Sequence, residues 1–200
     1  MVHLIALVVT LQWSNVAAVS PGTLLGAQTE VTRLYRNIGV TVEWSRAGSA
    51  DVRRDRLSLH VVIGDDEVGE LRSRRHPVMG AALRTEYGTG VVYVFSRRVE
   101  KEAARYDVSQ ALVLACAIAH EIGHLLLPDR GHSATGLMRG FWDREDFERA
   151  CQGQLRFSAE QATLIRAAVA GGPEHEPRGR GPDALVTMDR DGGASLRRER

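Results

Sequence analysis

The residues best suited to chemistry are two histidines and a glutamate in the segment His120-Glu121-Ile122-Gly123-His124. Side chains four residues apart on a helix lie on one face, one turn apart, so His120 and His124 can hold one metal ion through their ring nitrogens. Glu121 is rotated from His120 by about 100 degrees. It can therefore miss the metal and act as general base toward a water that a zinc ion activates.

A third ligand must follow this helix, because a catalytic zinc site uses three protein ligands and keeps a fourth position open. Our candidate is His132. The stretch before it, residues 128–131, has the proline and glycine expected of a bend that returns the chain to the metal. A carboxylate is the alternative third ligand, supplied by Glu145 or Glu148, and Asp129 is a further possibility.

Downstream of the HExxH helix come a glycine-containing turn, His132 followed by a serine, and then Gly136-Leu137-Met138. Together these features, within residues 107–142, resemble the metzincin clan of zincin metallopeptidases. The resemblance implies Zn2+ as the cofactor and Met138 as the methionine of the turn beneath the metal. It also implies an α+β, zincin-like single domain, in which a mixed twisted sheet accompanies an active-site helix and a C-terminal helix.

The connection to the third histidine departs from the clan pattern H-E-x-x-H-x-x-G-x-x-H, which would place a glycine at position 127 and the third ligand at position 130. This chain has Leu127 and Arg130 there, so its connection is two residues longer. With Glu145 or Glu148 as the third ligand, the chain would instead resemble the gluzincins, in which a glutamate from a later helix completes the site.

The activity that these features imply is that of a zinc metalloendopeptidase-like hydrolase acting on a peptide or protein substrate. Zinc would polarise the scissile carbonyl, and Glu121 would take a proton from the attacking water and deliver it to the leaving group. We expect an extended substrate to pair with the edge of a strand at residues 91–95. The alternatives are a zinc-binding protein of the same fold without catalysis, and a globular protein whose motif arose by chance.

The elements that would position this site begin with an apolar run at residues 4–13. We interpret it as a strand, although it also loosely resembles a secretion signal. Apolar spacing predicts a helix over residues 23–36, and β-rich runs predict strands over 40–44 and 57–63. A strand, a helix and a strand in this order favour parallel pairing of the first strands.

The second half of the chain contains the predicted site helix. Residues 65–89 are interpreted as mainly loop with a short strand near Ala81, and residues 91–95 as the last strand. The site helix is expected to start at Asp107 as its N-cap, with Gln110 completing a capping box, and to end at Pro128. Residues 111–119 are apolar without a break, so this helix should be buried on most sides.

Composition sets the remaining limits. A chain of 200 residues that is 44% hydrophobic and 26% charged predicts one domain over residues 1–170, closed by a helix that Ser158 caps. Residues 171–200 are rich in Gly, Pro, Arg and Asp and should form a disordered tail.

A net charge of +1 gives no reason to expect nucleic acid as a partner, and no apolar stretch reaches the roughly 20 residues that a membrane span needs. We expect a monomer, and both a secreted and a cytoplasmic location remain open.

The two cysteines, Cys116 and Cys151, are too few for a disulfide scaffold. Cys116 stands four residues before His120, on the same side of the predicted helix, where a zinc thiolate is conceivable. Because free cysteines are most often small buried core residues, we interpret Cys116 as part of the core.

Overall fold

A computed structural model describes residues 7–49, 57–65, 78–84, 89–129, 131–171 and 186–187. In these residues the strands are β1 Val8–Asn15, β2 Thr41–Arg46, β3 Leu57–Gly64, β4 Gly80–Arg84, β5 Gly90–Phe95 and β6 Val186–Thr187. The helices are α1 Pro21–Arg36, α2 Ser96–Tyr106, α3 Gln110–Leu126, α4 Arg144–Cys151 and α5 Ala159–Gly171.

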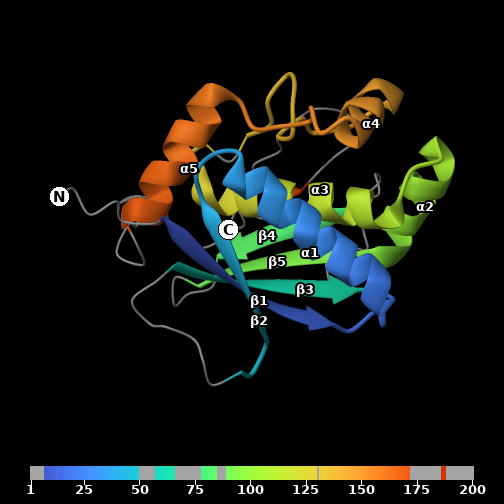
Figure 1. Ribbon diagram of the computed structural model, residues 1–200, viewed down its shortest axis with the longest axis horizontal. Coiled ribbons are helices and arrows are strands. Elements are labelled where there is room, and N and C mark those ends of the chain that lie inside the picture. Colours follow the sequence, from blue (N-terminus) through green and yellow to red (C-terminus); the bar gives the residue numbers. More distant parts are fainter. Residues whose placement is uncertain are drawn as a thin grey trace, which may run out of the picture.

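The strands form one mixed sheet in the order β2-β1-β3-β5-β4-β6 (Figure 1). β1 pairs in parallel with both β2 and β3, and β3 pairs in parallel with β5. The crossover through α1 makes the parallel return from β1 to β2 possible, which confirms the expected pairing of the first strands. β4 runs antiparallel to β5 and to β6, so the sheet is mixed and the fold is α+β, as expected.

β5 lies inside the sheet, between β3 and β4. Its Val92 is in register with Val61 of β3 on one side and with Ala82 of β4 on the other. The backbone groups on both edges of β5 are therefore already used within the sheet, and no further strand can pair there. The expectation that a substrate adds to residues 91–95 is wrong, because it placed this strand at an edge.

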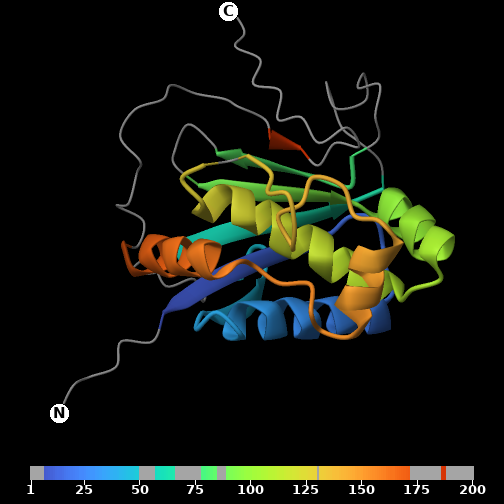
Figure 2. The ribbon, with the colours of Figure 1, turned by 90° about the horizontal axis from the view of Figure 1, so that it is seen from above.

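α3 packs on one face of the sheet, against β4 and β5 and beside α1; Figures 1 and 2 show both helices on the same side of the strands. From Val113 to Leu126 every residue of α3 is buried, which confirms the prediction of a helix enclosed on most sides. The hydroxyl of Tyr35 in α1 donates to the carbonyl oxygen of Ala119 at 3.1 Å and ties the two helices together. The ionisable side chains of α3 thus lie in the core.

A helix that the sequence analysis did not predict, α2, fills the stretch between β5 and α3. Its buried apolar residues are Val99 and Ala103, and most of its other side chains are charged. Asp107 closes α2 as a left-handed C-cap with φ of 55°, a conformation that aspartate tolerates better than most residues. α3 begins instead after Ser109, so the prediction of Asp107 as the N-cap of the site helix is wrong.

The closing helix, α5, begins as predicted. The Ser158 hydroxyl accepts from the Gln161 amide at 3.1 Å, and the Gln161 side chain accepts from the Ser158 amide at 2.9 Å. This is the reciprocal pattern of a capping box. The tail predicted over residues 171–200 lies outside the described residues except for Gly171 and β6, so its disorder stays a prediction. None of the described helices is long and apolar enough to cross a membrane.

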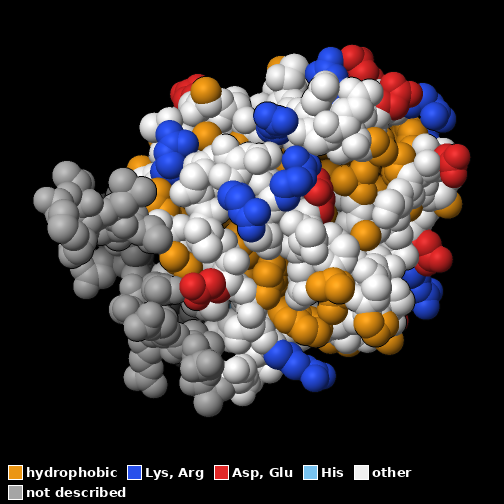
Figure 3. Space-filling view, viewed as in Figure 1, with side chains coloured by type: hydrophobic (Ala, Val, Ile, Leu, Met, Phe, Trp, Pro, Cys, Tyr) orange, Lys and Arg blue, Asp and Glu red, His pale blue; other side chains and the backbone are white. Residues whose placement is uncertain are grey.

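Two large apolar side chains are exposed near the start of the chain. Val16, after β1, is 73% exposed and Leu25, in α1, is 65% exposed. On the face of the molecule seen in Figure 1, apolar side chains gather over α1, and charged groups of both signs surround them (Figure 3). The rest of the apolar content lies mainly in one core cluster between the helices and the sheet.

The two cysteines differ in solvent exposure, and this difference predicts how fast each reacts with a thiol reagent. Both are free, with Cys151 exposed and Cys116 buried in α3, where burial raises the pKa of the Cys116 thiol to about 12. At pH 8 the thiolate fraction of Cys116 is then about one in ten thousand. A colorimetric thiol reagent should react rapidly with one cysteine per native chain and with the second only after unfolding.

Single variants assign the two reactions. Cys151→Ser should abolish the fast reaction, and Cys116→Ser should leave it unchanged. A fast thiol that remains in the Cys151→Ser variant would show that α3 is not enclosed as described.

Candidate metal centre

Three histidines meet at one end of α3. The candidate ligand atoms of His120, His124 and His132 all lie within 4.8 Å of one another, and within the described part of the chain this is the only group of three or more side chains suited to a metal ion. His120 and His124 are buried and His132 is partly buried. The structure therefore brings together the three residues that the sequence analysis named as ligands.

A backbone carbonyl sets the orientation of the His120 ring. Its Nδ1 lies 2.8 Å from the carbonyl oxygen of Leu137, and because a carbonyl oxygen only accepts, Nδ1 carries the proton. The lone pair is then on Nε2, which lies 2.9 Å from Nε2 of His124. Burial lowers the pKa of His120 to about 3, with the Leu137 hydrogen bond opposing the shift and His132 adding to it. The ring is neutral at pH 7, which is the form that binds zinc.

His132 is held by a loop that closes on itself. The amide of Ser133 donates to the carbonyl oxygen of Met138 at 2.8 Å, and the amide of Leu137 donates to that of Arg156 at 2.9 Å. A Cβ at Gly140 would lie only 2.7 Å from Nδ1 of His132, so the absence of a side chain at Gly140 gives the imidazole its place. The two extra residues in the connection are thus accommodated, and the third histidine still reaches the other two.

Met138 packs against the helix between its two histidines. It is fully buried, and a Cβ at Gly123 would overlap its sulfur. Gly123 therefore lets the loop that follows the helix come into direct contact with it. Met138 is the residue that the resemblance to the metzincins predicted beneath the metal, and the structure places it at this contact.

Glu121 lies in the core with neither carboxylate oxygen hydrogen-bonded to any group of the described protein. It is fully buried, and burial raises its pKa well above the usual range. A Cβ at Gly80 of β4 would lie 2.7 Å from Cγ of Glu121, so β4 covers the side chain closely. Burying such a group without a partner costs several kcal/mol. A ligand that hydrogen-bonds to the carboxylate would remove this cost.

An indole completes the surroundings of His120. The rings of Trp142 and His120 meet edge to face, with centroids 5.6 Å apart and planes at 89°. Trp142, Gly80, Gly140 and the Leu137 carbonyl had no role in the site predicted from the sequence. No spacing rule could have found them, because each reaches the site through a contact between segments distant in sequence or through a backbone group.

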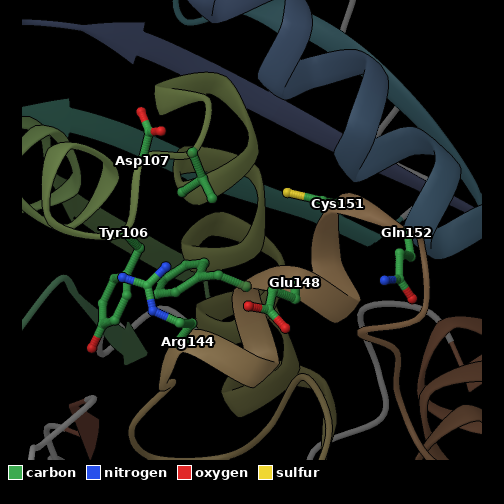
Figure 4. Close-up of a pocket in the computed structure, with 8 residues that line it drawn as sticks. Tyr106, Asp107, Arg144, Glu148, Cys151 and Gln152 are labelled. Atoms are coloured by element: carbon green, nitrogen blue, oxygen red, sulfur yellow. The ribbon is translucent and has the colours of Figure 1, made fainter.

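The carboxylates considered as third ligands lie elsewhere. Glu145 forms an exposed ion pair with Arg149, and Asp129 accepts a hydrogen bond from the Gly131 amide. Glu148 points toward a separate cavity of about 330 Å³ between α4 and the α2-α3 junction (Figure 4). None of the three belongs to the histidine group, so the structure gives no support to a glutamate ligand.

Comparisons with known proteins give remote likenesses. No protein-family model matches the chain, and no curated protein does. A zinc-dependent peptidase from Methanocorpusculum labreanum is similar in structure, with 14% identity and a TM-score of 0.49, over 78% of this chain and 99% of that chain. A Thermotoga maritima protein solved in solution has 15% identity and a TM-score of 0.32, over 87% and 99% of the two chains. Neither likeness places the chain in a family.

The clearance at Gly140 predicts how the centre responds to one added methyl group. Gly140→Ala should displace the His132 ring and weaken the binding of added Zn2+ by about 10- to 100-fold, as loss of a group that orients a ligand usually does. Competition against a chromophoric chelator measures this affinity. The matched control is Gly22→Ala, since a Cβ at Gly22 meets no atom within 4 Å. Equal affinity in the two variants would contradict the described placement of His132.

Proposed function

We propose that this chain is a zinc-dependent metallopeptidase, with His120, His124 and His132 as zinc ligands and Glu121 as the general base. The observation that carries the proposal is the Glu121 carboxylate, buried without a protein partner on the helix that presents two of three clustered histidines. A core that contains two buried imidazoles and an unpaired carboxylate, with a third imidazole against them, is costly unless these groups bind a ligand.

The donor set fits the proposed metal. Imidazole nitrogens suit zinc well, and three protein ligands leave one position open, as in catalytic sites. The Leu137 carbonyl fixes the tautomer of His120 in the way that outer hydrogen bonds fix metal-binding histidines. A zinc ion held there would supply a Lewis acid that polarises a carbonyl and lowers the pKa of water at neutral pH.

Glu121 would move the proton. Its position directly after His120 turns its side chain away from the histidine face, toward β4 and Gly80. Its carboxylate oxygens have no competing hydrogen bonds within the described protein, so they can accept a proton from water and return it to the leaving nitrogen of a cleaved peptide bond. The enclosure by α3 and β4 holds the carboxylate in one place during both transfers.

The metzincin-like arrangement is part of the proposal. The contact between Met138 and Gly123 supports a methionine turn beneath the metal, and the loop from Ser133 to Gly140 supports a third histidine reached over a longer connection. A peptide or protein is the proposed substrate class. A zinc-binding protein without catalysis would share the ligands and differ in having no use for Glu121.

Metal content tests the ligands without knowledge of the substrate. Purified protein, stripped of weakly bound metal and reloaded, should contain about one zinc per chain by elemental analysis. His120→Ala and His132→Ala should each lose it, while His60→Ala, in β3 and outside the histidine group, should keep it. A native chain that takes up no zinc would refute the proposal, and zinc retained by His132→Ala would refute the third ligand.

Glu121→Gln tests the general base. It should keep the zinc and lower kcat on a mixed peptide library by about 100- to 10,000-fold, the usual range for loss of a general base. Glu145→Gln is the matched control, because it makes the same chemical change in an exposed glutamate. Zinc binding with equal turnover in all three proteins would assign the chain to the non-catalytic class.

A further inference from the structure

The helix α4 carries two opposite charges that do not meet. Arg144 and Glu148 stand four residues apart on it, and at the same spacing on this helix the side chains of Glu145 and Arg149 form an ion pair at 2.6 Å. Within the described part of the chain, neither Arg144 nor Glu148 forms an ion pair or a side-chain hydrogen bond. The Arg144 guanidinium lies instead over the ring of Tyr106, 5.9 Å from its centroid and on the side away from Glu148 (Figure 4).

Both charges border the cavity of about 330 Å³ between α4 and the α2-α3 junction, a volume at the lower end of the range of small-ligand sites. One wall of this cavity is apolar. Phe147 is buried, its ring lies 4.8 Å from that of Tyr106, and it also meets Trp142 edge to face, with centroids 6.0 Å apart. Val108 adds an aliphatic surface. Because Phe147 is already packed against two other rings, a ligand that contacts it causes little further loss of side-chain entropy.

The charges on the rim indicate which kind of ligand fits. Two carboxylates, of Asp107 and Glu148, and one guanidinium, of Arg144, border the cavity. The carboxylates would repel an anion that has no positive group, and a cation that has no negative group would leave the guanidinium unused. A molecule with both charges and an apolar body can use a rim carboxylate, the guanidinium and the apolar wall together.

We propose that this cavity binds a free α-amino acid with an apolar side chain. The carboxylate of the ligand accepts from Arg144, its ammonium group donates to Glu148, and its side chain packs on Phe147. A peptide terminus carries only one of these two charges, which distinguishes the proposed ligand from a segment of a protein. The cavity is lined by residues outside the histidine group, so the inference does not rest on the proposed peptidase function.

Ligand-observed saturation-transfer NMR on the full-length chain tests the inference, with L-leucine as the probe. Leucine should bind with a Kd of about 1 to 10 mM, as expected for a ligand of this size. Leucinamide lacks the carboxylate and N-acetyl-leucine lacks the ammonium group, so each should bind about 10-fold more weakly. Equal binding of leucine and either analogue would refute recognition of both charges, and no binding of leucine up to about 50 mM would refute the site.

Matched variants of α4 place the ligand in the cavity. Arg144→Gln and Glu148→Gln should each raise the Kd of leucine by about 5- to 20-fold, because each removes a charge-assisted hydrogen bond. Arg149→Gln and Glu145→Gln make the same chemical changes in the exposed ion pair of this helix, outside the cavity, and should leave the Kd unchanged. The same Kd in the native chain and all four variants would refute the assignment.

Zinc separates the cavity from the histidine centre, because an amino acid can itself bind a zinc ion through nitrogen and oxygen. The Kd of leucine should be the same for the native chain stripped of metal and for the chain reloaded with Zn2+, and the variants are compared in the metal-free form. Binding confined to the reloaded chain would place leucine at the histidines and refute the cavity. Absence of zinc binding or of Glu121-dependent turnover, with leucine binding intact, would refute the proposed function alone.

Discussion

The fold depends on how α3 tolerates ionisable groups inside the core. His120, Glu121 and His124 are buried on a helix that is otherwise apolar from Val113 onward, packed against the sheet and α1. The imidazoles are accommodated because His120 bonds to a loop carbonyl and the histidines lie against each other. The Glu121 carboxylate has no such compensation within the described protein. The packing of α3 against the sheet therefore holds a buried carboxylate in place, and this carboxylate would gain hydrogen bonds only from a bound ligand.

Close approach of backbone segments lets the site form around this helix. Gly80 brings β4 onto Glu121, Gly123 brings Met138 onto the helix, and Gly140 makes room for His132. At each position a Cβ would lie closer to its neighbour than real Cβ atoms do. The three glycines belong to a strand, a helix and a loop, so the positions of the three histidines and of Glu121 depend on close approach between elements as well as on the side chains themselves.

Much of this arrangement was predictable from the sequence where the signal is local. The periodicity of α1, the apolar run of α3 and the four-residue spacing of His120 and His124 are properties of single segments. α2 was missed because its buried side is narrow, with Val99 and Ala103 among charged residues, and Asp107 was misassigned because it caps the end of α2 instead of the start of α3. The clearances at glycine and the Leu137 hydrogen bond were not predictable, because they join segments that only the tertiary fold brings together.

Strand order is the tertiary property with the greatest consequence for the site. The sequence places β4 before β5, yet β5 is inserted between β3 and β4 in the sheet. This order encloses residues 90–95 between two strands and puts Gly80, with its contact to Glu121, on the strand that lies between β5 and β6. On the side away from β5, β6 pairs with β4 at Ala81 and Ala82, the two residues that follow Gly80.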